Sequence, residues 1–198
     1  MKRLSFALTL IFISSVSNAQ SSTEIPDQHV TSVGVSIELP FLSNGISYDY
    51  SDNKEHSQTG YLGGGICLFY RKNKNKFFVN YEHPSLKKNL FPPKGGSADF
   101  NTNIAEFTIH HTLHRSFALI GGINYATYRF HSYNDVQPIR EIDKSDATVG
   151  LTTGAEYLPA QATAIGFTYR PSLISFGSKS YRHILSLFFR YDINFWKK

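Results

Sequence analysis

The stretch Leu185–Phe195 reads Leu-Ser-Leu-Phe-Phe-Arg-Tyr-Asp-Ile-Asn-Phe, and it decides the fold class. Its odd positions are all apolar or aromatic: Leu185, Leu187, Phe189, Tyr191, Ile193 and Phe195. The even positions are polar, with Phe188 as the exception. Strict alternation over about 11 residues indicates a β-strand with two chemically different faces, and this length suits a tilted strand that crosses a bilayer.

The N-terminus predicts export. Lys2 and Arg3 precede an apolar run over residues 4–16, and small residues follow it, as at a signal-peptide cleavage site. We therefore interpret residues 1–19 as a signal peptide and residues 20–198 as one domain. The rest of the chain has no apolar run of the ~18 residues that a membrane helix needs, so a membrane protein with this sequence must be a barrel.

The composition fits a strand-built membrane protein. Charged residues make up only 18% of the chain and aromatic residues 15%, yet the mean hydropathy is negative, at −0.26. These values are expected when only alternate residues face lipid. The single cysteine excludes a disulfide framework within the chain. The net charge of +5 includes two residues of the signal peptide, so it does not suggest a nucleic-acid partner.

Alternating segments recur along the chain, and we predict eight strands from them. They cover residues 29–40, 61–71, 76–84, 102–113, 117–130, 147–157, 163–173 and 183–196. Short connections (72–75, 114–116 and 158–162) alternate with long ones (41–60, 85–101, 131–146 and 174–182). Outer-membrane barrels place short turns in the periplasm and long loops outside the cell. An even number of strands then leaves both termini on the periplasmic side.

The kinds of polar residue predict which face is inside. One face of the strands is aliphatic and aromatic, whereas the other has small residues with Glu and Arg and no Lys in any strand centre. A water-facing surface is normally rich in Lys, while a narrow lumen needs small side chains and paired charges. We therefore predict an ion-pair network inside the barrel, formed by Glu38, Arg71, Glu82, Glu106, Glu156, Arg170, Arg190 and Asp192. A secreted, lipocalin-like binding barrel with the faces reversed is the alternative.

Aromatic residues gather near the predicted strand ends. Those on the turn side are Tyr70, Phe77, Phe117, Tyr157, Phe195 and Trp196, and those on the loop side are Tyr61, Tyr81 and Tyr169. Two such groups are typical of the girdles that mark both membrane interfaces.

Together with the closing sequence Arg190-Tyr191-Asp192-Ile193-Asn194-Phe195, these features resemble small outer-membrane β-barrels of the OmpA/OmpX-like superfamily. The resemblance covers the mature chain and implies an all-β fold, an eight-stranded antiparallel up-and-down transmembrane barrel in the bacterial outer membrane. It also implies that Tyr191, Ile193 and Phe195 are the signal that the barrel-insertion machinery reads. The chain departs from the pattern because Trp196-Lys197-Lys198 follow the aromatic that usually ends such proteins.

The predicted function is a structural or surface-interaction role, similar to adhesion, carried by four extracellular loops. Eight strands enclose a lumen that side chains just fill, which argues against a general porin. The expected partners are outer-membrane lipid and lipopolysaccharide, the insertion machinery and an unknown extracellular partner. We expect a monomer without a cofactor, a metal or a nucleic-acid partner.

Lipid A modification is the enzymatic alternative. A deacylase family of similar barrels uses His-x-Ser with a downstream Glu near the outer strand ends, and this chain has His131, Ser132 and Glu141 there. The histidine and the serine are adjacent, so a continuous strand would place them on opposite faces. We therefore predict no enzymatic activity, unless the strand has ended before this pair.

Other candidate sites have simpler explanations. His110 and His114 would lie about 13 Å apart along one strand face, too far for one metal ion to bridge, and His111 would face lipid near the periplasmic rim. Cys67 fits a small residue of the lumen. The glycines of residues 63–65 follow a loop but precede no helix, so they do not form a phosphate-binding loop.

Overall fold

The computed structural model describes residues 30–49, 54–60, 62–87, 96–114, 116–134, 140–160, 162–177 and 180–198. The predicted signal peptide, residues 1–19, lies outside these ranges. Within them no helix has both the length and the apolar character to cross a membrane.

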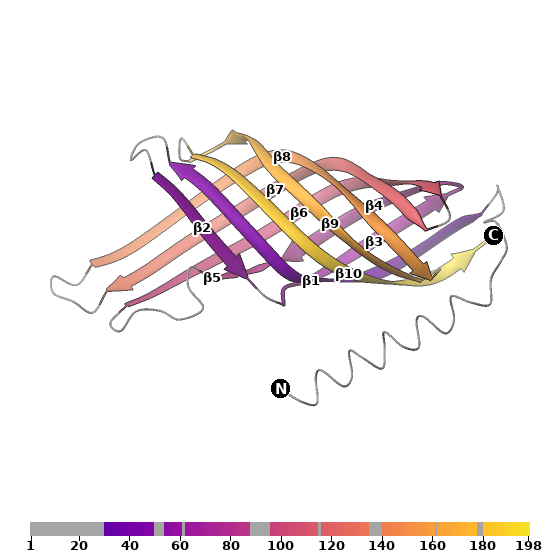
Figure 1. Cartoon of the computed structure of the whole chain (residues 1–198), viewed down its shortest axis with the longest axis horizontal. Helices are drawn as coiled ribbons and strands as arrows, with labels where there is room; N and C mark the ends of the chain where they lie inside the picture. Colours follow the sequence, from indigo (N-terminus) through magenta and orange to yellow (C-terminus); the bar gives the residue numbers. More distant parts are fainter. Residues whose placement is uncertain are drawn as a thin grey trace, which may run out of the picture.

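Ten strand segments form one closed antiparallel sheet (Figure 1). They are β1 (Thr31–Asp49), β2 (Lys54–Gly60), β3 (Gly64–Lys72), β4 (Asn75–His83), β5 (Ser85–Lys87), β6 (Gly96–His114), β7 (Phe117–Asn134), β8 (Arg140–Ala160), β9 (Thr163–Ser175) and β10 (Ser180–Lys197). β2 leads into β3, and both pair with β1; β4 leads into β5, and both pair with β6. The barrel therefore has eight strands, two of them interrupted, and the predicted fold class is confirmed.

The interruptions lie at one level of the barrel wall. Leu62 has a positive φ of 59°, and the Gly63 N–H donates to the Pro40 carbonyl at 2.8 Å. β1 has a register shift between Pro40 and Leu42, and Pro84 separates β4 from β5. Because proline has no N–H to offer to the ladder and disturbs regular pairing, the pairing of three neighbouring strands is interrupted at this level.

The strands extend much further at the loop end than the alternation predicted. Most of the described residues in the predicted connections 41–60, 85–101 and 131–146 belong to strands, and β7 and β8 remain paired up to Asn134 and Arg140. The prediction of four long loops is therefore wrong in detail, although long and short connections do alternate. The error in loop length has a physical cause. Hydrophobic alternation ends where lipid ends, whereas backbone pairing continues into water.

β10 closes the barrel against β1. Ile37 lies opposite Tyr191 and Val35 opposite Ile193 on one face, while Glu38 lies opposite Arg190 on the other. This register keeps both rows of the closing strand continuous with those of β1.

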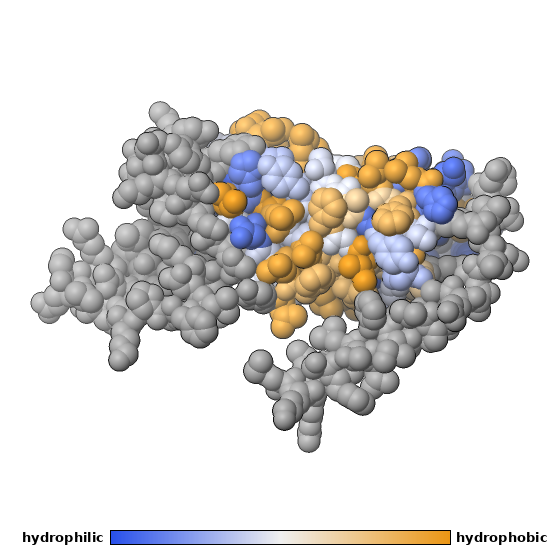
Figure 2. Space-filling view, viewed as in Figure 1, coloured by the Kyte–Doolittle hydropathy of each residue, from blue (hydrophilic) through white to orange (hydrophobic). Residues whose placement is uncertain are grey.

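The outer wall carries a broad apolar belt, visible as orange atoms across the middle of the barrel (Figure 2). Leu68 and Ile123 are 62% and 59% exposed, whereas Arg190 in the lumen is fully buried. The lipocalin-like alternative needs the opposite arrangement, so the observed faces argue against it.

Aromatic side chains flank this belt on the outer wall. At the turn end Tyr70, Phe117, Tyr157, Phe195 and Trp196 are exposed, and at the loop end Tyr81 and Tyr169 are exposed. Tyr61 lies outside the described residues. The predicted girdle residues that the structure describes thus lie on the outer wall, with Phe77 half-exposed, but Phe107 and Phe167 are also exposed between the two groups.

Candidate functional site: the lumen and the extended rim

The level of the lumen nearer the turns is organised around Arg190. Its Nη1 lies 2.7 Å from Glu156 Oε2, and its Nε lies 3.1 Å from Asp192 Oδ1. The Arg190 guanidinium carbon also lies 4.4 Å from the centre of the Phe78 ring, in a cation–π contact. His110 Nδ1 lies 3.1 Å from Glu156 Oε1, so both oxygens of this carboxylate face a nitrogen.

Lys76 also belongs to this level, although the predicted network did not include it. It forms an ion pair with Asp192, whose Oδ1 also accepts a hydrogen bond from Ser36 Oγ at 2.6 Å. The ammonium nitrogen lies 4.0 Å from the centre of the Phe69 ring. Lys76 has the inward parity of Phe78, and this parity was the signal that could have identified it.

The level nearer the loops is organised around Arg170. Its Nε and Nη2 donate to the two oxygens of Glu106 at 3.0 and 3.1 Å, and Nη2 also lies 2.6 Å from Glu82 Oε2. Asn80 Nδ2 and Thr152 Oγ1 complete the shell of Glu106 at 3.0 and 2.9 Å. Arg170 therefore crosses the lumen from β9 to carboxylates on β4 and β6, and the two carboxylates lie side by side only because of it.

Glu38 lies between the two levels. Its register partner Arg190 forms ion pairs with Glu156 and Asp192. Glu38 instead lines a cavity of about 10 Å³, together with Cys67, Phe78, Asn80, Glu106, Thr108, His110, Ile120, Thr168 and Phe188. A cavity of this size holds about one water molecule.

Arg71 is the predicted member that the structure does not bring into either level. It lies at the turn end, half-buried, where its Nε donates to the Asn73 carbonyl at 3.3 Å. Asn73 has a positive φ of 56° in the tight turn between β3 and β4. Arg71 thus contacts this turn, whereas its register partner Lys76 forms the ion pair with Asp192.

Aromatic side chains also fill the lumen. Phe69, Phe78 and Phe188 are at most 3% exposed, and the Phe69 and Phe78 rings contact each other at 5.8 Å between centroids. Phe188 is the exception to the alternation of the closing strand, and its position inside the barrel explains that exception. Rings and ion pairs together leave little open space at these levels.

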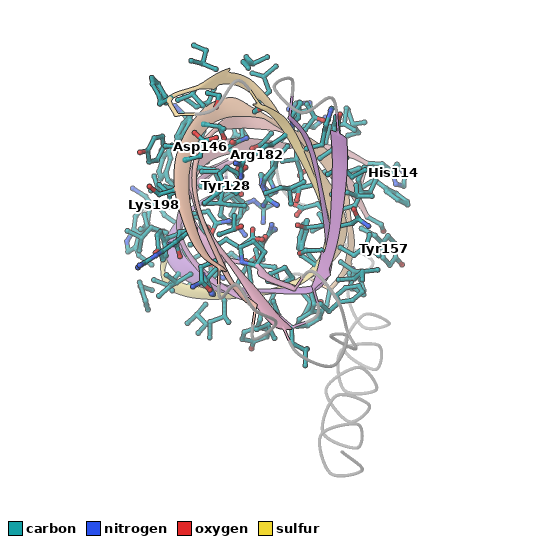
Figure 3. The ribbon with its side chains drawn as sticks, turned by 90° about the vertical axis from the view of Figure 1, so that its left-hand side faces the viewer. His114, Tyr128, Asp146, Tyr157, Arg182 and Lys198 are labelled. Carbon is teal, nitrogen blue, oxygen red and sulfur yellow. The ribbon has the colours of Figure 1, made fainter. Side chains whose placement is uncertain are left out.

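The mouth of the lumen at the extended end carries one more ion pair. Arg182 Nη2 lies 3.2 Å from Asp146 Oδ2, and the Arg182 guanidinium carbon lies 4.2 Å from the centre of the Tyr128 ring. Figure 3 shows these three side chains grouped at one side of the barrel mouth. Ser172 Oγ accepts a hydrogen bond from the Arg182 backbone N–H at 2.8 Å, which holds β10 against β9.

A depression of about 390 Å³ opens at the extended end of the barrel. It is lined by Asn101, Asn103, Thr127, Tyr128, Arg129, Ser145, Asp146, Ala147 and Phe176, which come from β6, β7, β8 and the segment after β9. Its volume is within the range of small-molecule sites. The outward row changes from apolar to polar here, so the depression lies where the wall leaves the apolar belt.

The strand register separates the three residues of the enzymatic alternative. β7 continues past this point to Asn134, so His131 and Ser132 occupy opposite faces of one strand. Glu141 lies opposite Tyr133, which places it on the same face as His131. The structure does not describe these three side chains, but the backbone register does not bring all three residues to one face.

The remaining histidines and the cysteine lie apart. His110 points into the lumen, whereas His111 is exposed on the outer wall and bonded to Asn75 Oδ1 at 2.7 Å. The described residues contain no group of three or more His, Cys, Asp or Glu side chains that could hold a metal ion. Cys67 is buried, and its Sγ donates to Asn80 Oδ1 at 3.2 Å.

Comparison with known proteins identifies the fold through structure alone. No protein-family model and no curated protein matches the sequence. The attachment invasion locus protein Ail of Yersinia pestis matches the structure with a TM-score of 0.57 and 12% identity, covering 84% of this chain and 100% of that one. A second Ail structure, in complex with the heparin analogue sucrose octasulfate, matches with a TM-score of 0.58, 11% identity and the same coverages. Neisserial surface protein A matches with a TM-score of 0.50 and 14% identity, covering 83% of this chain and 97% of that one.

Proposed function

We propose that this protein is an integral outer-membrane β-barrel whose extended end has a structural or surface-interaction role, and that it is not a general porin. The observation that carries the proposal is the division between wall and lumen. Ion pairs and aromatic rings fill the lumen, and the outer wall is apolar, so the polar ends remain as the surfaces that can meet a partner.

The apolar belt supports a membrane location. Exposed apolar patches on soluble monomers rarely exceed a few hundred Å². Here the outward rows of all eight barrel strands contribute to the belt, and tyrosine, phenylalanine and tryptophan lie at its edges. A bilayer covers such a belt, and the closed barrel satisfies the backbone hydrogen bonds inside it.

The extended end supports a surface role. β6, β7 and β8 continue past the apolar belt, and residues of all three strands line the depression of about 390 Å³. The structures of Ail and of Neisserial surface protein A share this fold, and Ail is named for attachment and invasion. We therefore assign recognition of an extracellular partner to this end.

The charge of the extended end bears on the kind of partner. Its basic residues are Lys54, Lys87, Lys88, Lys94, Arg129, Arg140, Lys144, Lys179 and Arg182. Its acidic residues, only one fewer, are Asp49, Asp52, Glu55, Asp99, Asp135, Glu141, Asp143 and Asp146. This balance gives no general attraction for a polyanion such as the heparin analogue bound to Ail, so we propose recognition by shape and hydrogen bonding.

Two further partners belong to the membrane role. The closing strand, with Tyr191, Ile193 and Phe195 in its outward row, is the proposed contact with the insertion machinery. Outer-membrane lipid and lipopolysaccharide are the proposed surroundings of the belt and of the wall above it.

Trypsin treatment of intact cells tests this topology. We expect cleavage only after lysines and arginines of the extended end, because the turn end faces the periplasm. Folding is monitored by heat-modifiable gel mobility, and permeabilised cells provide the control in which the turn end becomes accessible. Cleavage after Lys74 in intact cells would contradict the proposal, as would recovery of a monodisperse protein without detergent.

Attachment of whole cells tests the surface role. Cells that display the wild-type barrel should bind a host-cell or matrix surface better than cells displaying a variant whose residues 88–95 are replaced by a short turn. Equal heat-modifiable mobility of the two proteins excludes a folding defect. Equal attachment would assign the role elsewhere or show that the barrel is only structural.

We propose no enzymatic role. Mass spectrometry of lipid A from cells with and without the protein should show identical acyl chains. The register of His131, Ser132 and Glu141 supports this expectation. Loss of an acyl chain that requires Ser132 would overturn it.

A further inference from the structure

The turn end of the barrel carries a one-sided charge that the proposed surface role does not use. Its basic residues are Arg71, Lys72, Lys74, Lys76, Arg115, Lys197 and Lys198. Lys76 points inward to Asp192, whereas Lys72, Lys74, Lys197 and Lys198 are exposed. Figure 1 shows the C-terminus at this end of the barrel, next to the hairpin of β3 and β4 and opposite the extended ends of β7 and β8.

Two of these lysines share one row of the outer wall. The Lys198 and Thr31 backbones exchange hydrogen bonds at 2.8 and 2.9 Å, and Thr31 pairs with Lys72 on its other side. Lys198 and Lys72 therefore flank Thr31 on neighbouring strands. Two strand spacings place their backbones about 10 Å apart.

An aromatic row lies directly above the lysine row. Val33 pairs with Trp196 on β10 and with Tyr70 on β3, and these two aromatic side chains are 49% and 41% exposed. A register shift beside Trp196 keeps Lys198 on the outer face along with it. The lysine row lies two residues further along each strand than the aromatic row, and the distance between the two rows is about 7 Å.

These spacings match the layers of a bilayer interface. Aromatic rings of a girdle lie at the boundary between acyl chains and headgroups, so lysines about 7 Å further out lie at the height of the lipid phosphates. Among the residues whose burial the structure describes, every acidic side chain points into the lumen or its mouth, away from this lysine row. These are Glu38, Glu82, Glu106, Asp146, Glu156 and Asp192.

We propose that Trp196, Tyr70, Lys72 and Lys198 form a binding site for the headgroup of an anionic phospholipid in the periplasmic leaflet. The aromatic pair contacts the glycerol region and the upper acyl chains, and the lysine pair binds the phosphate. Lys74 and Lys197 add to the local positive potential. This site rests on the membrane location of the barrel but not on any adhesive role of the other end.

The only tryptophan of the chain, Trp196, provides the measurement. The folded barrel is inserted into phosphatidylcholine bilayers that contain either brominated phosphatidylglycerol or brominated phosphatidylcholine, and quenching of Trp196 fluorescence is recorded against the mole fraction. We expect phosphatidylglycerol to associate about fivefold more strongly, equivalent to about 1 kcal/mol. Salt at 0.5 M should reduce this preference, because it screens exposed charges (Debye length roughly 4 Å).

Matched variants locate the site. The double variant Lys72→Gln/Lys198→Gln should bring the preference close to one. Lys54→Gln/Lys144→Gln removes the same charge from the extended end and should retain the full preference. Heat-modifiable mobility verifies that both variants are folded.

Two outcomes would overturn the proposal. The first is equal quenching by the two brominated lipids in the wild-type barrel. Lysine-dependent sedimentation with insoluble peptidoglycan would then assign the basic end to the cell wall. The second is a preference that survives in Lys72→Gln/Lys198→Gln. If cell attachment is lost but the lipid preference is unchanged, only the proposed surface role is affected.

Discussion

Arg170 and Arg190 are the two residues on which the interior depends most. Each is almost fully buried, and each holds two carboxylates, Glu82 with Glu106 and Glu156 with Asp192. Burying a charge without a partner costs several kcal/mol, whereas paired and hydrogen-bonded charges come close to balance. Loss of either arginine should therefore lower the free energy of unfolding by more than its own contacts suggest, because two buried carboxylates are left without their cation.

Replacement of Arg190 tests this at the residue scale. Arg190→Met should reduce the free energy of unfolding by roughly 3–5 kcal/mol, as when one partner of a buried pair is removed. Urea unfolding in lipid vesicles, monitored by gel mobility, measures it. Lys74→Met removes an exposed cation from a turn and should cost less than about 0.5 kcal/mol. Similar losses in both variants would contradict the role of Arg190, whereas Glu156→Gln/Asp192→Asn added to Arg190→Met should restore part of the stability.

At the scale of elements, the two faces of one strand have different tolerance for added volume. Gly121 and Gly122 are neighbours in β7. A Cβ added at Gly121 would meet nothing within 4 Å, whereas one added at Gly122 would lie 2.2 Å from the Phe107 carbonyl oxygen on β6. The obstacle at Gly122 is backbone, which cannot move without disturbing the strand ladder.

The adjacent substitutions Gly122→Ala and Gly121→Ala provide a matched pair. Gly122→Ala should lower the free energy of unfolding by roughly 1–3 kcal/mol through overpacking. Gly121→Ala should be neutral or stabilise by up to about 1 kcal/mol, because the unfolded chain loses freedom. Equal effects in the same urea experiment would show that the inner and outer faces of β7 are not distinguished by packing.

At the scale of the whole molecule, the closed barrel is a packed wall around a packed interior. An eight-stranded lumen has just enough room for side chains, and here rings and ion pairs occupy it at two levels. The residues that line the depression all lie near the extended end, so it does not lead through the barrel. The architecture therefore suits contact with partners at its ends better than transport through its centre.

Planar bilayer recordings test this closure. The purified barrel should give no stable conductance steps of the size that general porins give, even at high protein concentration. A general porin recorded in the same bilayers is the positive control. Regular porin-sized steps, abolished by removal of the protein, would contradict a filled lumen.

The sequence alone determined the fold class and the direction of each face, whereas the closing role of the last strand was implied only by the resemblance to small outer-membrane barrels. The sequence could determine the fold class and the faces because period-2 alternation is a local property, and lipid on one side and a crowded lumen on the other require different residues at alternate positions. Outside the apolar belt both faces meet water, so the signal ended there. For that reason the predicted loops were too long, and the extensions of β7 and β8 were missed.

Only the tertiary structure decided which charges meet. Glu82, Glu106 and Arg170 come from three strands, and their meeting depends on the stagger of strands around the barrel, which no local pattern encodes. The same stagger brought Lys76 to Asp192, left Arg71 at the rim and set Lys198 beside Thr31 and Lys72. Alternation determines whether a side chain points in or out, whereas the closed register determines what it touches.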